Sequence, residues 1–404
     1  MFASLLAQEV RHRLRQLSTH VYFAIFFGVS FLLMNALGGA FTDANVTIFG
    51  MGPNTNANSP FAINATTLFV SLLGLMITAP FMGQSVYRDY DSGIHPLVFS
   101  TPVSKAKYLG SRFLGAVLVH LYLYAGLTAG LVLGAAAPWV DPSQLGAFRP
   151  MAYLQPYLLY LLPNLLWVGG LFVALPAFTR RMLPNYIGGV LLFMGYNIAA
   201  VLLGGDALRN STVASVVDPF GLIPTQQLTR YWTAAEQNAQ LVPLEGMVLL
   251  NRALWLGVGL AVVAGLYVGF RFAHLPGQQS GDDDETGAEG PSLAEVTPTS
   301  LIHAVDLPEA TLSEHWGARL RQFASIVRRS FLYVVRDVYF YAIVGASIIF
   351  LVVTASQSGQ INGTPVQPVT YHIVGQLGSQ FFLFMVILIT FYAGQLVWRE
   401  RDVE

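Results

Sequence analysis

Eight long apolar segments recur along the chain, separated by shorter polar stretches. They cover residues 20–38, 66–86, 110–136, 154–178, 184–205, 248–270, 337–355 and 376–398. Each approaches or exceeds the roughly 20 residues that a membrane-crossing helix needs. Backbone groups in lipid must bond within their own segment, so these stretches predict helices. Barrel strands would alternate apolar and polar positions, which these segments do not. The pattern predicts an all-α polytopic membrane protein.

An amphipathic pattern precedes the first and the seventh of these spans. Apolar residues recur at three- and four-residue spacing, with arginines on the other side. The first stripe is Ala3, Leu6, Val10, Leu14 and Leu17, and the second is Trp316, Leu320, Phe323, Val327, Phe331 and Val334. Such helices suit the membrane surface, where arginine meets lipid phosphate. We expect an interfacial helix before each of these two spans. A soluble helix packed on a cytoplasmic domain is the alternative, but the sequence offers no such domain.

Basic residues occupy alternate loops. They precede the first span (Arg11, Arg13, Arg15), follow the second (Arg88, Lys105, Lys107, Arg112), follow the fourth (Arg180, Arg181) and flank the stretch between the sixth and seventh. The intervening loops hold few, although the net charge of the whole chain is only −1. Lys and Arg favour the cytoplasmic side of a membrane. We therefore expect a multi-pass membrane protein with a cytoplasmic amino terminus and the 206–247 loop outside.

One stretch of sequence is repeated about three hundred residues later. Residues 83–91 read GQSVYRDYD and residues 394–402 read GQLVWRERD, each at the end of an apolar run. We interpret residues 1–275 as a complete six-span unit and residues 315–404 as the start of a second copy, with an interfacial helix and two spans. The acidic, glycine-rich segment 276–314 predicts a disordered cytoplasmic linker. The second copy breaks off where it should continue, so we expect the chain to be part of a longer protein.

Familiar catalytic motifs are absent from the sequence. It contains no Gly-x-x-x-x-Gly-Lys-Ser/Thr phosphate loop, no His-Glu-x-x-His zinc helix and no cysteine. We expect no catalytic, cofactor or metal site, and no role in nucleic-acid binding. We also expect the span interiors to be free of Asp, Glu, Lys and Arg, which argues against an ion-driven secondary transporter. Gln84 and Gln395, each after a glycine near the end of its span, are candidates for interhelical hydrogen bonds.

The charged segment after the second span, residues 87–108, is the best functional candidate. It combines charges of both signs, a glycine break and the sequence Ser-Thr-Pro-Val-Ser-Lys. Ser104 is placed to cap a helix that begins near Lys105. An ordinary positive-inside loop is the alternative interpretation.

In this segment the chain resembles the membrane subunits of ABC-2-type exporters. An acidic stretch, a glycine and Ser100-Thr101-Pro102-Val103-Ser104-Lys105 before a span are shared features, as are an interfacial helix, six spans and a long outer loop after the fifth. The region 218–244 is similar to a bacterial subgroup that carries two permease copies and, in its long members, a zinc aminopeptidase domain. The resemblance implies an export permease of a bacterial cytoplasmic (inner) membrane that is not itself an enzyme. Its partners would be a separate ABC ATPase, a second permease unit and the lipid bilayer.

The resemblance also implies which residues meet the ATPase. The candidate coupling residues are Arg88, Asp89, Asp91, Ser104, Lys105 and Lys107, with Arg399 and Glu400 in the second copy. Two other functions stay open: the membrane anchor of a larger zinc peptidase and, disfavoured by the span interiors, a secondary transporter. The transported substrate is not readable from the sequence.

Overall fold

The computed structural model describes residues 1–41, 51, 54–203, 212–271, 315–357, 360–361, 364–365, 367 and 369–399. The chain divides into two compact units, one of Met1–His274 with Ala342–Leu388 and the other of Leu275–Tyr341 with Ile389–Glu404. The predicted linker, 276–314, lies outside the described residues.

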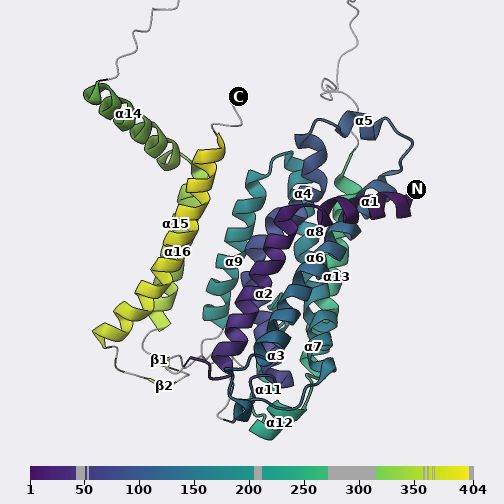
Figure 1. Ribbon diagram of the computed structural model, residues 1–404, viewed down its shortest axis with the longest axis vertical. Coiled ribbons are helices and arrows are strands. Elements are labelled where there is room, and N and C mark those ends of the chain that lie inside the picture. Colours follow the sequence, from purple (N-terminus) through teal and green to yellow (C-terminus); the bar gives the residue numbers. More distant parts are fainter. Residues whose placement is uncertain are drawn as a thin grey trace, which may run out of the picture. The chain divides into compact units, whose positions relative to one another are not determined.

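The described chain is almost wholly helical (Figure 1). The first part contains α1 (Phe2–Leu14), α2 (Leu17–Leu37), α3 (Pro60–Leu73), α4 (Leu75–Asp91), α5 (His95–Phe99), α6 (Lys105–Ala135), the 3₁₀ turn η1 (Pro142–Gln144), α7 (Pro150–Pro156), the π-helical turn η2 (Tyr157–Leu161), α8 (Leu162–Thr179), α9 (Leu183–Leu203), α10 (Thr212–Val217), α11 (Leu222–Thr229), α12 (Ala234–Ala239) and α13 (Gly246–Gly269). Residues 315–399 contain α14 (Trp316–Val335), α15 (Val338–Gln357), β1 (Gln360–Ile361), β2 (Thr364–Pro365) and α16 (Thr370–Arg399). Within this stretch, Ala342–Leu388 belongs to the first compact unit.

Several of these helices are long and apolar enough to cross a membrane, which indicates a multi-pass membrane protein. Among the described residues, five pass on length and composition: α2, α6, the continuous Pro150–Thr179 segment, α13 and Val338–Ser356 of α15. A sixth is counted if α3 and α4 form one bent span. The spans predicted at 184–205 and 376–398 are also helices, α9 and most of α16, but they are not among these six.

Glycines bring α2 and α6 into close contact. Gly126, Gly130 and Gly134 recur every four residues along α6 and therefore share one face. A Cβ atom added at Gly126 would lie 2.6 Å from the Phe23 carbonyl oxygen, and one at Gly130 would collide with the Phe27 carbonyl. Small residues at this spacing let two helix backbones approach each other, the usual packing device within membranes.

The second predicted span is broken at Gly74, which the apolar run alone did not predict. α3 and α4 meet there at a bend of 58°. A side chain at Gly74 would collide with the ring of Phe26, which lies 2.8 Å from the Cβ position. Pro80 inside α4 weakens the preceding turn, because it has no N–H to donate to the carbonyl four residues earlier. The bend leaves α3 almost wholly buried, whereas α4 runs on to the charged segment.

Loops tie the bundle together at the end that carries α12. Asn58 exchanges two hydrogen bonds with the Gly146 backbone, at 2.8 and 2.7 Å. Thr233 and Glu236 form a capping box that starts α12, and the Thr55 hydroxyl donates to Gln237 at 2.5 Å. This α12 end lies opposite the end that carries α5 (Figure 1). The described parts of the predicted outer loops 39–65, 137–153 and 206–247 therefore meet at one end.

The last helices have a simple local arrangement. α15 and α16 pair antiparallel through Phe350 and Phe384, whose ring centroids are 5.3 Å apart. The turn between them holds the short antiparallel pair β1–β2, so the all-α prediction has this one exception in the described chain. On α14 no residue is buried, and its apolar stripe and its arginines are largely exposed.

Candidate functional site

The charged segment folds as a short element between α4 and α6. α4 ends at Asp91, and the Ser92 hydroxyl donates to the Arg88 carbonyl at 2.7 Å. Gly93 then takes a positive φ of 66°, a conformation that favours glycine, and the chain turns into α5. α5 lies at the tip of its end of the bundle (Figure 1). This segment therefore folds as a turn and a short helix between α4 and α6, where an ordinary loop was the alternative interpretation.

One aromatic side chain anchors α5. Phe99 is 4% exposed, and its ring lies 5.5 Å from that of Tyr108 and 6.2 Å from that of Phe270. The other side of α5 faces outward: Leu97 is 71% exposed and Ile94 is 41% exposed. α5 is thus fixed on one side and presents apolar side chains on the other.

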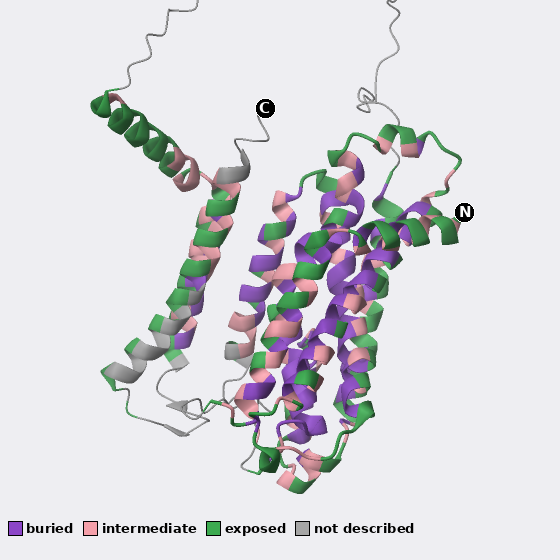
Figure 2. Cartoon of the chain, viewed as in Figure 1, coloured by how far each residue is buried: buried purple, intermediate pink, exposed green. Residues whose placement is uncertain are grey.

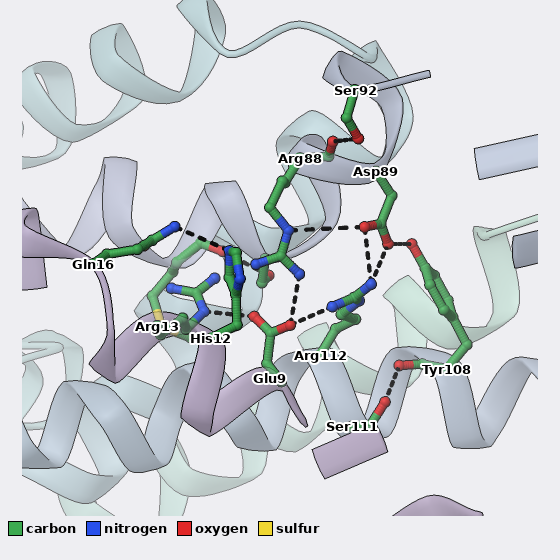
Figure 3. A network of polar contacts seen from close by, with 12 residues as sticks. Glu9, His12, Arg13, Gln16, Arg88, Asp89, Ser92, Tyr108, Ser111 and Arg112 are labelled. Atoms are coloured by element: carbon green, nitrogen blue, oxygen red, sulfur yellow. Dashed lines mark hydrogen bonds and ion pairs between the residues drawn. The ribbon is translucent and has the colours of Figure 1, made fainter. Parts of the chain in front are cut away.

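Behind α5, charged side chains from α1, α4 and α6 form a buried network (Figure 3). The Glu9 carboxylate accepts from Arg13 Nε at 2.6 Å, from Arg88 Nη2 at 2.8 Å and from Arg112 Nη1. Arg112 Nη2 also donates to Asp89 at 2.8 Å. Glu9, Arg13 and Asp89 are each at most 2% exposed. We call these five residues the α1–α4–α6 network.

The network is completed by two neighbours of different kinds. The Tyr108 hydroxyl donates to Asp89 Oδ2 at 2.8 Å. Arg13 Nη1 donates to the Phe81 carbonyl at 2.9 Å, and its guanidinium lies 4.7 Å from the centre of the Phe81 ring. Phe99 packs on Tyr108, so the anchor of α5 touches a side chain that is bonded to the network.

Electrostatics favours the ionised form of Glu9. Burial by itself raises the pKa of this carboxyl, but the guanidinium groups of Arg13, Arg112 and Arg88 outweigh it and bring the pKa to about 2. Burial lowers the pKa of the Arg13 guanidinium, and Glu9 partly offsets that. Three arginines face two carboxylates, so the network carries one excess positive charge.

The predicted coupling residues fall into three groups. Arg88 and Asp89 belong to the α1–α4–α6 network. Asp91, Ser104 and Lys107 are exposed, and Lys105 is half-buried, with its Nζ 3.3 Å from the Val268 carbonyl. The side chain of Arg399 and the whole of Glu400 lie outside the described residues. α6 begins at Lys105 as predicted, but Ser104, at the N-cap position, makes no side-chain capping bond.

Sequence reasoning missed Glu9 and used Arg13 and Arg112 only for topology. Glu9 is the sole acidic residue in the first fifteen, and it lies one helical turn before Arg13. That lone carboxylate on a basic helix was the available signal. Its partners on α4 and α6 could not be found from spacing, because tertiary packing brings them together.

The two Gly-Gln pairs differ in their surroundings. A side chain at Gly83 would collide with Asn185 of α9, so this glycine does permit close approach, whereas nothing described lies within 4 Å of a Cβ at Gly394. Gln395 Nε2 donates to the Tyr333 hydroxyl of α14 at 3.0 Å. Gln84 is exposed.

The expectation of uncharged span interiors is wrong at Arg252. This arginine lies within α13 and is 4% exposed. Its Nη1 donates to Asn164 Oδ1 at 3.0 Å and its Nε to Asn251 Oδ1 at 2.9 Å. The neighbouring Asp218 carboxylate accepts two backbone N–H bonds, and burial raises its pKa. The cluster joins α8 and α13 to the loop between α10 and α11, so buried protein groups satisfy the charge that pattern analysis overlooked.

Arg112 is a second departure, because it lies within the predicted span 110–136 and joins the network described above. Among the described residues, no group of three or more His, Asp or Glu side chains could hold a metal ion. Searches against protein-family models, curated proteins and solved structures find no match to this chain.

Proposed function

We propose that this chain is the membrane-spanning permease component of an ATP-driven exporter and that residues 91–107 receive the movement of a separate ATPase subunit. The observation that carries the proposal is α5, which is anchored by buried Phe99 while Leu97 is 71% exposed. An exposed apolar residue at a helix tip, with Asp91 and Lys107 exposed nearby, suits a groove on a protein partner.

The network gives this element a mechanical connection to the bundle. A force on α5 would pass through Phe99 to Tyr108, and from there to Asp89 and Arg112. Glu9 extends the connection to α1. In this proposal Arg88 and Asp89 position the coupling element, because Asp89 is buried and its oxygens are occupied. Ile94, Leu97, Asp91 and Lys107 would make the direct contacts.

Close packing supports a path between two units and not through one. The residues on the inner sides of the bundle helices are buried (Figure 2). The cavity beside Thr78, Tyr124 and Asn164 measures about 10 Å³, roughly the space of one water molecule. An exported molecule would therefore pass along the outside of one unit, where a second unit faces it. The six-span unit followed by the start of a second copy belongs to this proposal, as do the bacterial inner membrane and the cytoplasmic amino terminus.

A secondary transporter is not favoured, although Arg252 removes part of the argument against it. Arg252 Nε donates to Asn251 and Nη1 donates to Asn164. This pairing is typical of a charge with a structural role and not of one that binds a transported substrate. A membrane anchor for a zinc peptidase is compatible with the same bundle, but that function would not explain why α5 exposes apolar side chains.

Co-purification tests the proposal. The tagged protein, isolated from its native membranes, should bring down an ABC ATPase that mass spectrometry identifies. Leu97→Asp should abolish that recovery without changing thermal melting, because Leu97 is exposed. Tyr231→Asp is the matched control: it is 83% exposed and lies in the predicted outer loop. Equal ATPase recovery with Leu97→Asp and with the control would remove the coupling role of α5.

A further inference from the structure

An apolar groove runs along the outer side of α1. One part has a volume of about 580 Å³ and is lined by Leu6, Ala7, Val10, Leu14 and Leu118. A neighbouring part of about 300 Å³ shares Val10, Leu14 and Leu118 and continues to His20 and Tyr122. The groove therefore spans α1, the start of α2 and the outward side of α6.

The orientation of α1 about its own axis is unusual for a helix surrounded by water. Its charged residues Glu9 and Arg13 point into the bundle, while the apolar stripe forms the open groove. Exposing such a stripe to water is unfavourable, but a bilayer covers it at no cost. α1 lies across the ends of α2 and α6 (Figure 1), as expected of a helix at the membrane surface.

Two arginines stand at the rim of this groove. Arg11 and Arg15 line it, both are exposed, and they lie one helical turn apart. Within the described chain neither guanidinium forms an ion pair. Glu9 is the only carboxylate of α1, and it is turned away and held by three other arginines. The rim therefore offers two uncompensated positive charges beside an apolar channel.

We propose that this groove is a binding site for an anionic phospholipid, with an acyl chain against Leu6, Val10 and Leu118 and the phosphate on Arg11 and Arg15. Charge and shape agree: an apolar groove alone would accept any lipid, but paired arginines at its rim select a negative headgroup. A protein helix in the groove would need carboxylates at two successive turns as well as an apolar face. The site is independent of the proposed export function, because it shares no residue with α5 or the coupling segment.

Native mass spectrometry of the detergent-purified protein tests the site. The probe is an equimolar mixture of phosphatidylglycerol and phosphatidylcholine, and the readout is the lipid retained on the protein. The unaltered protein should prefer phosphatidylglycerol. Removing both charges with Arg11→Gln and Arg15→Gln should weaken that binding roughly 30-fold, from about 1 kcal/mol for each basic residue. Arg181→Gln with Arg271→Gln, two exposed arginines outside the groove, should leave it unchanged.

A second variant tests the groove without touching its charge. Ala7→Phe fills the channel and should displace the lipid, whereas Ala253→Phe, at an exposed position on α13, should not. Melting curves confirm that each variant is folded. Equal retention of the two lipids by the unaltered protein would overturn the proposal, as would a preference for phosphatidylglycerol that survives either test variant.

Discussion

Glu9 lies at the centre of the α1–α4–α6 network. Its two carboxylate oxygens hold arginines from α1, α4 and α6, so one side chain joins three helices. Burying a charge is costly unless it is paired, and removing one member of a buried set leaves the others uncompensated. Here the loss would leave three arginines facing Asp89 alone.

Replacing Glu9 should therefore destabilise the protein. We expect Glu9→Gln to cost about 3–5 kcal/mol, the range for breaking a buried ion pair. Thermal or denaturant unfolding in detergent measures it. Glu245→Gln, an exposed carboxylate at the start of α13, is the matched control and should have little effect. A Glu9→Gln protein as stable as the control would show that the network contributes nothing to the fold.

Acid should weaken the same interaction. The folded-state pKa of Glu9 is about 2, below its ordinary value of 4.5. A carboxyl with a lowered folded pKa stabilises the protein above its unfolded pKa and loses that contribution as pH falls through the folded one. The stability difference between the unaltered protein and Glu9→Gln should be constant above about pH 5 and shrink between about pH 4.5 and pH 2. Melting at a series of pH values measures it, and a difference independent of pH would contradict the assignment.

At the scale of helices, apolar runs predicted most of the structure. The length of each run is enough to place a membrane helix, and α2, α6 and α13 lie within a few residues of the predicted positions. The break at Gly74 and the burial of α3 were not predictable from one apolar run, because packing between helices, such as the close approach of Phe26 to Gly74, is not visible in it. Likewise, the stripe on α1 showed that the helix is amphipathic but not which face turns inward. Glu9 and its distant partners decide that.

The α2–α6 contact provides a test at this scale. Gly126→Ala should destabilise the bundle by about 1–3 kcal/mol, because the new methyl group would meet the Phe23 carbonyl. Gly28→Ala on α2 is the control, since nothing described lies within 4 Å of its Cβ position. Unfolding in detergent compares the two. Equal stability would mean that α2 and α6 are not held in close contact by these glycines.

For the whole molecule, the loops separate into two sets by charge. Arg88, Lys105 and Arg180 lie at the α5 end, where Arg180 stands over the ring of Tyr90 and Lys105 reaches Val268. Asn58, Gly146 and Gln237 lie at the α12 end. The alternation of basic loops therefore predicted which loops share an end. Which residues contact one another at each end depends on tertiary packing, and the sequence pattern does not predict those contacts.

Accessibility in intact cells tests the orientation. The chain has no cysteine, so one can be added at a time. Tyr231→Cys at the α12 end should react with a membrane-impermeant maleimide, and Ser100→Cys at the α5 end should react only after the membrane is opened. Gln237 is a poorer site because it is buried. The reverse labelling pattern would invert the proposed topology.

Photo-crosslinking from Leu97 tests whether α5 docks on an ATPase. A photoreactive amino acid replaces Leu97, and the same group replaces Trp139 near the α12 end, which is 61% exposed. After illumination of native membranes, we predict a covalent adduct between position 97 and an ABC ATPase, and none from position 139. Adducts from position 97 that contain only lipid or unrelated proteins, with the ATPase present in the membranes, would contradict the account.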